Sequence, residues 1–247
     1  MLEFYHEYKH KLVILIICIC SHQIIAEPSY TFCNTFTVLC AKLNEPSLIN
    51  TNIGHRFYGP ISDGLESLYG MDNGANVILY SAYALSQHDQ LHVQRIRQDK
   101  EFQVGYQRSQ QFYNMPLYVT LQLNAMWFNS NNESIFNGFT VFGLSYNFGG
   151  GQLHSTIGID HFENKRGLGS AIVLSIHEDW DLITEGYTTT SSKDSAFSLG
   201  LVYHTFGHRF KIGIHNSTAM SFRTLMNGTA NRDWVFGFQI HRLLEWE

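Results

Sequence analysis

The sequence has few charged residues, no basic cluster and, beyond its first 20 residues, no long apolar run. Charged residues make up 15% of the 247-residue chain, well below the roughly 25% of a typical soluble domain. The formal net charge is -5 and the lysines and arginines are scattered, so the chain offers no basic patch to nucleic acid. A membrane helix needs about 20 consecutive apolar residues, and no run of that length occurs. These absences argue against a nucleic-acid-binding protein and against a helical membrane protein.

Proline is also scarce, whereas aromatic residues and glycines are frequent. The chain has 4 prolines against 20 glycines, 18 phenylalanines and 13 tyrosines, and aromatic residues reach 14%. An intrinsically disordered chain shows the opposite bias, with many charges and few aromatics. The composition is therefore typical of a folded protein whose surface partly faces lipid.

The N-terminus has the three parts of a secretory signal peptide. Lys9 and Lys11 precede an apolar run at 12–20, and Ala26 precedes a polar segment. A cationic start, a short apolar core and a small residue at the cleavage site are the features of such a signal. We therefore expect cleavage after Ala26. The predicted organisation is a signal peptide at 1–26, an N-terminal leader at 27–50 and a β-barrel domain at 51–247.

The leader has no clear periodicity and is interpreted as a plug or an extra strand. It contains Cys33 and Cys40, while Cys18 and Cys20 lie inside the predicted signal peptide. In an exported protein, Cys33 and Cys40 could form a small disulfide loop, or they could remain two unpaired thiols. Zinc is a weaker interpretation, because two thiols alone do not complete a tetrahedral site.

From about residue 52 onward, apolar and polar residues alternate with the period of two that is typical of β-strands. The pattern is clearest at 117–127, and glycine- and asparagine-rich turns such as 129–132 and 149–151 separate successive segments. The sequence predicts an all-β protein, an antiparallel up-and-down transmembrane β-barrel of about 10–12 strands. The predicted strands lie at 52–58, 76–85, 91–97, 101–108, 117–127, 142–148, 152–162, 168–177, 180–190, 197–203, 210–214 and 234–240.

The alternation by itself permits two orientations. In a soluble barrel the apolar face lines the core, whereas in a membrane barrel it meets lipid and the small polar face lines the lumen. The polar faces are rich in Gly, Ser, Thr, Asn, Gln and His and poor in Lys and Glu, and aromatic residues gather at strand ends, as at Trp127 and Trp234. We therefore predict that the apolar rows face lipid.

Several stretches carry a recognisable pattern: GHRFYGPISDG at 54–64, GMDNGAN at 70–76, YHTFGHRFKI at 203–212 and WVFGFQIHRL at 234–243. They resemble a family of uncharacterised outer-membrane β-barrel proteins of Gram-negative bacteria, a domain of unknown function. The resemblance covers most of residues 50–247. It implies the fold and an outer-membrane location, and it carries over no catalytic residue.

Two copies of Gly-His-Arg-Phe, at 54–57 and 207–210, provide the first candidate binding residues. His55, Arg56, His208 and Arg209 could lie at one rim and bind an anion or carboxylate. The alternative, which we favour, is that these side chains anchor the barrel at the membrane–water boundary.

Two further groups have both a functional and a structural interpretation. Asp72 and Asn73 could belong to a cation-binding loop, but Asp-Asn-Gly is more often a tight turn. His204, His215 and His241 are predicted to face the lumen on neighbouring strands. They could bind a transition metal or act as a base, although a hydrogen-bond network that fills the lumen is favoured.

The preferred function is a non-enzymatic outer-membrane barrel that passes or holds a small molecule or anchors a partner. One alternative is a lipid-modifying hydrolase built from Ser198, Ser217, Glu185, His204 or His208, although no nucleophile elbow or paired-carboxylate motif supports it. Another is a soluble periplasmic barrel that binds an apolar ligand. No catalytic residue, metal or cofactor is assigned. The expected partners are outer-membrane lipid and a small-molecule ligand, without nucleic acid.

Overall fold

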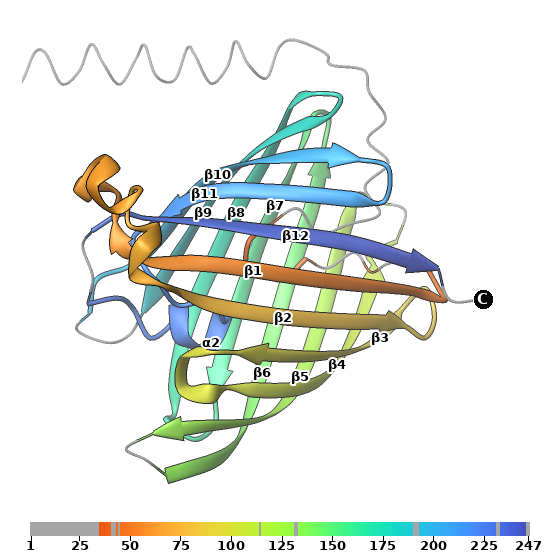
Figure 1. The fold of residues 1–247 in the computed structure, drawn as a ribbon. Helices are drawn as coiled ribbons and strands as arrows, with labels where there is room; N and C mark the ends of the chain where they lie inside the picture. Colours follow the sequence, from red (N-terminus) through yellow and green to blue (C-terminus); the bar gives the residue numbers. More distant parts are fainter. Residues whose placement is uncertain are drawn as a thin grey trace, which may run out of the picture.

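A computed structural model describes residues 35–40, 43, 45–113, 115–130, 133–189, 193–230 and 233–245. In this part of the chain, twelve antiparallel strands form one closed barrel (Figure 1). They are β1 (Leu48–Pro60), β2 (Ala75–Ala84), β3 (Asp89–Ile96), β4 (Phe102–Gln111), β5 (Leu117–Ser130), β6 (Glu133–Phe148), β7 (Gly151–Asp160), β8 (Lys165–His177), β9 (Trp180–Thr189), β10 (Ala196–Thr205), β11 (His208–His215) and β12 (Val235–Glu245).

The barrel is a simple up-and-down meander. Each strand pairs with the next one along the chain, and β1 closes the sheet against β12 from Leu48 opposite Glu245 to Pro60 opposite Val235. The predicted all-β architecture is therefore confirmed, and the strand number lies at the upper end of the expected range. Each of the twelve predicted segments corresponds to one strand.

The helical elements are short and lie in the connections. They are η1 (Ile61–Ser67), η2 (Met71–Asn73), η3 (Gln98–Lys100) and α2 (Phe222–Leu225). Among the described residues, no helix is both long enough and apolar enough to cross a bilayer.

The two ends of the barrel differ in the length of their connections. At the end where β1 begins and β12 finishes, turns such as 149–150, 178–179 and 206–207 join the strands; we call this the short-turn end. The opposite end, the long-loop end, carries the connection of 14 residues between Pro60 and Ala75 and the long connection between His215 and Val235. Short turns at one end and longer loops at the other are usual in outer-membrane barrels.

The apolar side chains point away from the barrel axis. Leu123 and Phe142 are 47% and 48% exposed, while their strand neighbours Asn124 and Val141 are buried in the lumen. The same alternation runs through the other strands, so the orientation predicted from the sequence is confirmed. A soluble barrel would place these apolar rows inside, and that alternative is wrong.

Aromatic side chains gather near both ends of the outer surface. Trp180 and Tyr203 lie at the short-turn end with ring centroids 4.7 Å apart, and Trp127 and Phe136 lie at the long-loop end at 5.1 Å. Two aromatic levels that flank an apolar band are typical of barrels in a bilayer, because these rings favour the interfaces.

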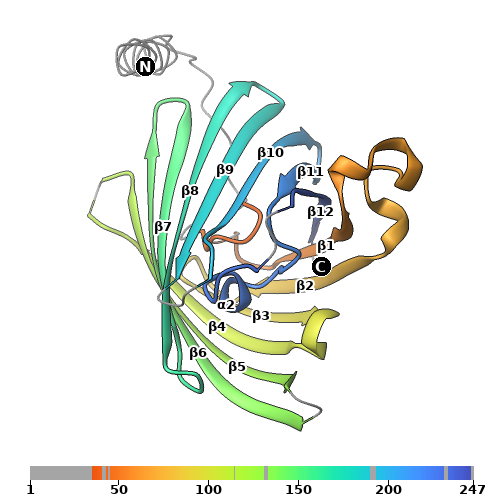
Figure 2. The same ribbon diagram turned by 90° about the vertical axis from the view of Figure 1, so that its left-hand side faces the viewer.

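Two chain segments lie inside the barrel (Figure 2). One consists of residues 35–40, here called the N-terminal segment, which runs across the lumen. The other consists of residues 216–230 of the connection between β11 and β12, here called the inner loop, which carries α2 into the long-loop end. Their apolar side chains form cores inside the barrel: Phe36 contacts one small cluster, and Val38, Phe222 and Met226 belong to another.

Candidate functional site in the lumen

The lumen wall formed by β9, β10 and β11 carries buried charges. Glu185 on β9 is 2% exposed and Lys211 on β11 is fully buried. Both occupy inward-facing positions between residues that face outward. Buried charges are costly unless they are paired or hydrogen-bonded, and here their partners come from the N-terminal segment.

Glu185 holds the N-terminal segment through its backbone. Its Oε1 accepts hydrogen bonds from the backbone N–H groups of Phe36, at 2.5 Å, and Thr37, at 3.2 Å. Its Oε2 accepts a hydrogen bond from the Tyr187 hydroxyl at 2.5 Å. Hydrogen bonds to an ionised carboxylate are among the stronger ones in proteins, so Glu185 is the main anchor of this segment.

Other strands hold the segment by its carbonyl oxygens. The Lys211 ammonium donates a hydrogen bond to the carbonyl of Thr35 at 2.6 Å, and Gln239 Nε2 donates one to the carbonyl of Phe36 at 3.2 Å. On the wall formed by β4, Gln107 Nε2 donates to the carbonyl of Cys40 at 3.0 Å. The segment therefore spans the lumen between opposite walls. Cys40 is disulfide-bonded. Cys33, the partner considered from the sequence, lies outside the described residues.

Two glycines make room for the Phe36 ring. A Cβ at Gly200 or Gly213 would lie 2.6 or 2.7 Å from Phe36 Cζ, closer than atoms approach without a rearrangement. The edge of the same ring packs against His215, with centroids 4.9 Å apart. The wall is therefore shaped around this segment as well as bonded to it.

A second buried charge cluster holds the inner loop. Arg223 on α2 donates to Glu101 Oε2 through Nε at 3.0 Å and Nη2 at 2.8 Å, and its Nη1 lies 3.6 Å from Asp160 Oδ2. Its guanidinium also stacks 4.1 Å above the Phe128 ring. Burial lowers the pKa of Arg223 and the two carboxylates raise it; the net shift is upward, so the side chain stays charged.

Arg56 on β1 joins the two inserted segments. It is almost fully buried. Its Nη2 donates to the Thr37 hydroxyl at 3.2 Å, and its Nη1 donates to the carbonyl oxygens of Ala219 and, at 3.4 Å, Ser217. One guanidinium therefore contacts the wall, the N-terminal segment and the inner loop. Polar contacts therefore hold both inserted segments in the lumen, beside the apolar cores that these segments form.

Comparison with known sequences decides the family. A family described as "Membrane bound beta barrel domain (DUF5777)" matches residues 33–148 and 166–244. The chain belongs to this family. The outward-facing apolar rows of the barrel are therefore its membrane surface. No curated protein matches the chain at a significant level.

Two solved KdgM porin structures share the fold of this membrane-bound barrel. A KdgM porin matches with a TM-score of 0.55 at 9% sequence identity, covering 79% of this chain and 98% of the porin. A KdgM porin in complex with disordered oligogalacturonate gives the same TM-score and identity, covering 78% and 98% of the two chains. The NanC porin matches with a TM-score of 0.49 at 10% identity, covering 81% of this chain and 100% of the porin.

The free-energy cost of an arginine on the membrane face should depend on its depth in the bilayer. Leu123 is an outward-facing residue near the middle of β5. Leu123→Arg should lower the free energy of unfolding in phospholipid by about 2–4 kcal/mol, because a charge at the bilayer midplane loses its hydration. The measurement is reversible urea unfolding in liposomes.

The matched control for Leu123→Arg lies on the same face of β4 at the short-turn end. At this end of the strand, Gln110→Arg should cost about 0–1 kcal/mol. Equal costs at the two positions would contradict the assignment of the apolar rows to lipid.

The two Gly-His-Arg-Phe copies do not share a rim, so the shared binding site considered from the sequence is not formed. His55 and Arg56 lie within β1 toward its long-loop end, whereas His208 opens β11 after the turn at the short-turn end. β1 and β11 run in the same direction, but the first copy lies in the second half of its strand and the second copy lies at the beginning of its strand. Arg56 and Arg209 are buried in the lumen, while His55 faces outward and stacks on Phe238 at 4.8 Å.

Asp72 and Asn73 form the exposed turn η2. Gly70 and Gly74 flank this turn with φ angles of 85° and 78°, conformations that favour glycine. This geometry matches the favoured interpretation of a tight turn. Among the described residues, the group of His, Asp and Glu ligands close enough to hold an ion is His177, Glu178 and Asp179 in the exposed turn between β8 and β9.

The three histidines lie on adjacent strands and face the lumen, as predicted, but each has a different neighbour. His204 Nε2 lies 2.8 Å from Asp181 Oδ2, His215 Nδ1 lies 2.7 Å from Ser198 Oγ, and His241 Nε2 lies 3.3 Å from Gln239 Oε1. His204 and His241 both lie opposite Arg209 in the strand register. His215 is six positions further along β11, about 20 Å away, so the three cannot share one ion.

The proposed hydrolase residues do not form a catalytic set. Ser198 is hydrogen-bonded to His215, but no carboxylate in the described part of the chain is hydrogen-bonded to that imidazole. Glu185, the intended acid, instead binds the N-terminal segment. Ser217 lies in the inner loop, where its hydroxyl accepts a hydrogen bond from the backbone of Ala219.

Sequence reasoning missed the residues that close the lumen. Lys211, Glu101 and Arg223 were not singled out, and Glu185 was considered only as a catalytic acid. A signal was present for two of them, because Lys211 and Glu185 are charged residues at inward positions of alternating strands. A buried charge is costly unless it is paired or hydrogen-bonded, so a charge at such a position needs a partner inside the barrel.

Proposed function

We propose that this barrel resides in the outer membrane of a Gram-negative bacterium and passes or holds a small molecule in its lumen. The difference between short turns and long loops supports the location, because outer-membrane barrels show it. Export through a signal peptide at 1–26, with cleavage after Ala26, belongs to the same proposal; these residues lie outside the described ones.

One observation carries the proposed function: separate chain segments close the lumen, and polar contacts hold them there. In an eight-stranded barrel the side chains of the wall just fill the interior. A twelve-stranded barrel is wider, and here the N-terminal segment and the inner loop occupy the additional space. Displacing them would leave a lumen lined by Asn, Gln, His and Ser together with the charged Arg56, Glu185 and Lys211, a surface suited to polar solutes.

Similarity to porins is compatible with this role. KdgM, which shares the fold, has been solved with oligogalacturonate, so a barrel of this shape can take a carbohydrate.

The proposal predicts that removing both closures opens the barrel. The test variant lacks residues 27–44, which removes Cys33 and Cys40 together, and has residues 218–230 replaced by a short Gly-Ser linker. In planar bilayers the full chain should carry little ion current. The variant should carry a steady current at least about tenfold larger, as expected for an open lumen wider than that of an eight-stranded barrel.

Each single variant provides a control that separates the two closures. Deleting 27–44 alone, or replacing 218–230 alone, should give an intermediate current. Heat-dependent migration on gels confirms that each variant is folded. A folded double variant that carries no more current than the full chain would exclude passage through the lumen.

A further inference from the structure

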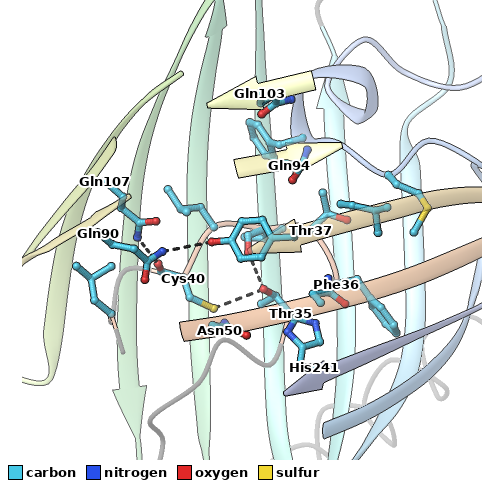
Figure 3. A pocket seen from close by; sticks show the side chains of 18 of the residues that line it. Thr35, Phe36, Thr37, Cys40, Asn50, Gln90, Gln94, Gln103, Gln107 and His241 are labelled. Atoms are coloured by element: carbon cyan, nitrogen blue, oxygen red, sulfur yellow. Dashed lines mark hydrogen bonds between the residues drawn. The ribbon is translucent and has the colours of Figure 1, made fainter. Parts of the chain in front are cut away.

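A cavity lies between the N-terminal segment and the wall formed by β1 to β4 (Figure 3). Its volume is about 150 Å³. The N-terminal segment forms one side of it, and Phe139, Met220 and Phe222 contribute apolar surface from β6 and the inner loop. The other side is a wall of polar side chains.

The polar wall is one continuous row across five neighbouring strands. Register pairs connect β12 to β1, β1 to β2, β2 to β3 and β3 to β4, and every member of the row lines the cavity. From strand to strand the members are His241, Asn52, Tyr80, Gln94 and Gln103. Asn50, Gln90 and Gln107 line the cavity beside the row. Figure 3 shows the amides around the N-terminal segment.

This lining differs from the rest of the lumen in its lack of charge. Among the described residues that line the cavity, none is Asp, Glu, Lys or Arg. Elsewhere in the lumen, Glu185, Lys211, Arg56 and Arg223 are buried. A charged ligand would lose its hydration here without gaining an opposite charge, which is unfavourable. The cavity therefore suits a neutral molecule.

Three buried polar atoms belong to side chains that line the cavity. Asn50 Oδ1, Asn52 Oδ1 and His241 Nδ1 have no hydrogen-bond partner among the described residues. All three side chains are more than nine-tenths buried. Leaving such groups unpaired costs about 1–3 kcal/mol each, and a purely apolar ligand would leave that cost in place.

We propose that the cavity binds one neutral, hydroxyl-rich small molecule, of the size of a single sugar ring, between the amide row and the N-terminal segment. An amide offers both donors and acceptors, as each hydroxyl does, so a row of amides matches a row of hydroxyls. The apolar side, with Phe139 and Phe222, suits the C–H face of such a ring. A cavity of about 150 Å³ can hold one six-membered ring.

The inference rests on the proposed function in one respect, because the ligand has to enter through the lumen. A molecule in this position would contact the amide row and the N-terminal segment together. It would therefore bias the position of the segment that closes the barrel.

The test uses the full chain in a detergent without a sugar headgroup, with three sugars that share one ring. D-galactose is neutral, D-galacturonate is an anion and D-galactosamine is a cation. Isothermal titration calorimetry should show binding of galactose, with both charged sugars at least about tenfold weaker, because neither finds a counter-charge.

Two substitutions at Asn52 localise the site. Asn52→Leu should weaken galactose binding about tenfold, the range expected for one lost hydrogen bond and its unpaired partner. Asn52→Asp keeps the shape and adds a negative charge, so it should reverse the order and make galactosamine the better ligand. Gln122→Leu is the matched control: this inward-facing amide on β5 lies outside the cavity lining, and galactose binding should persist.

Each alternative outcome overturns the inference. If no sugar binds up to about 100 mM, well beyond the millimolar range of weak ligands, the cavity holds water only. Equal binding of neutral and charged sugars, or a folded Asn52→Leu variant with unchanged affinity, would exclude the amide row as the site. The bilayer current of the variant without closures does not depend on sugar, so a failed titration beside an open variant refutes this inference alone.

Discussion

Glu185→Gln is expected to release the N-terminal segment and to destabilise the barrel by about 3–5 kcal/mol, the range found when one member of a buried charge group is removed. The carboxylate accepts two backbone N–H groups of the segment and the hydroxyl of Tyr187. Its charge also acts on buried Arg56 and Lys211. The glutamine keeps the shape but removes a negative charge that acts on both cations.

Thermal unfolding in detergent, followed by circular dichroism, measures this loss. Bilayer recordings should also show frequent openings, because the two short contacts to Phe36 and Thr37 are weakened. Glu178→Gln is the control: it removes a carboxylate from the exposed turn between β8 and β9, where surface substitutions usually stay within about 0.5 kcal/mol.

A double-mutant cycle shows whether the charge is the cause. Lys211→Met alone should also destabilise, because it removes a cation near Glu185 and the hydrogen bond to Thr35. Combined with Glu185→Gln, it should cost less than the two separate losses added together, since neither charge is then left alone. Strict additivity would show that the two charges do not interact. A Glu185→Gln variant as stable as Glu178→Gln would show that Glu185 does not anchor the segment.

Arg223→Met is expected to cost a similar amount, about 3–5 kcal/mol, at the other closure. Arg223 and Glu101 are 3% and 1% exposed, and Asp160 lies beside them. Without the guanidinium, two carboxylates would face each other inside the barrel. The inner loop would leave the lumen more readily, since α2 would lose its charged attachment to the wall.

Two measurements follow the effect of Arg223→Met. Thermal unfolding reports the stability, and chymotrypsin, which cleaves after aromatic residues such as Phe222, should cut the inner loop faster than in the unmodified protein. Adding Glu101→Gln should restore part of the stability, because one of the two unpaired carboxylates is then neutral.

The chain offers a matched control in an exposed ion pair. Lys165 lies 2.6 Å from Glu163, with side chains 41% and 30% exposed. Lys165→Met should cost no more than about 1 kcal/mol, since solvent screens surface pairs. If Arg223→Met behaves like Lys165→Met, the cluster around Arg223 does not hold the inner loop.

Much of the barrel could be predicted because each strand in a bilayer has to alternate apolar side chains, which face lipid, with polar side chains, which face the lumen. The alternation at 117–127 places Leu123 outside and Asn124 inside whatever the neighbouring strands are. The same rule identified segments for all twelve strands and the inward direction of His204, His215 and His241. Turn chemistry also predicted η2, where Gly74 has a positive φ.

The closures could not be predicted in this way, because they depend on contacts between distant residues. Phe36 and Glu185 are 149 positions apart, and Glu101 and Arg223 are 122 apart. A period of two assigns a face to each residue but not its level in the barrel, which the strand register sets. The shared rim considered for the Gly-His-Arg-Phe copies could not be tested from the sequence for this reason.

By itself, the sequence determined that this is an antiparallel barrel with apolar side chains toward lipid and small polar side chains inward. That much follows from one local constraint, since every strand has to present one face to each environment. Only the tertiary structure decided what occupies the lumen, which charges meet there and that His241, Asn52, Tyr80, Gln94 and Gln103 form one row. The physical reason is that closing the sheet fixes the stagger of all strands together, and no single segment contains that information.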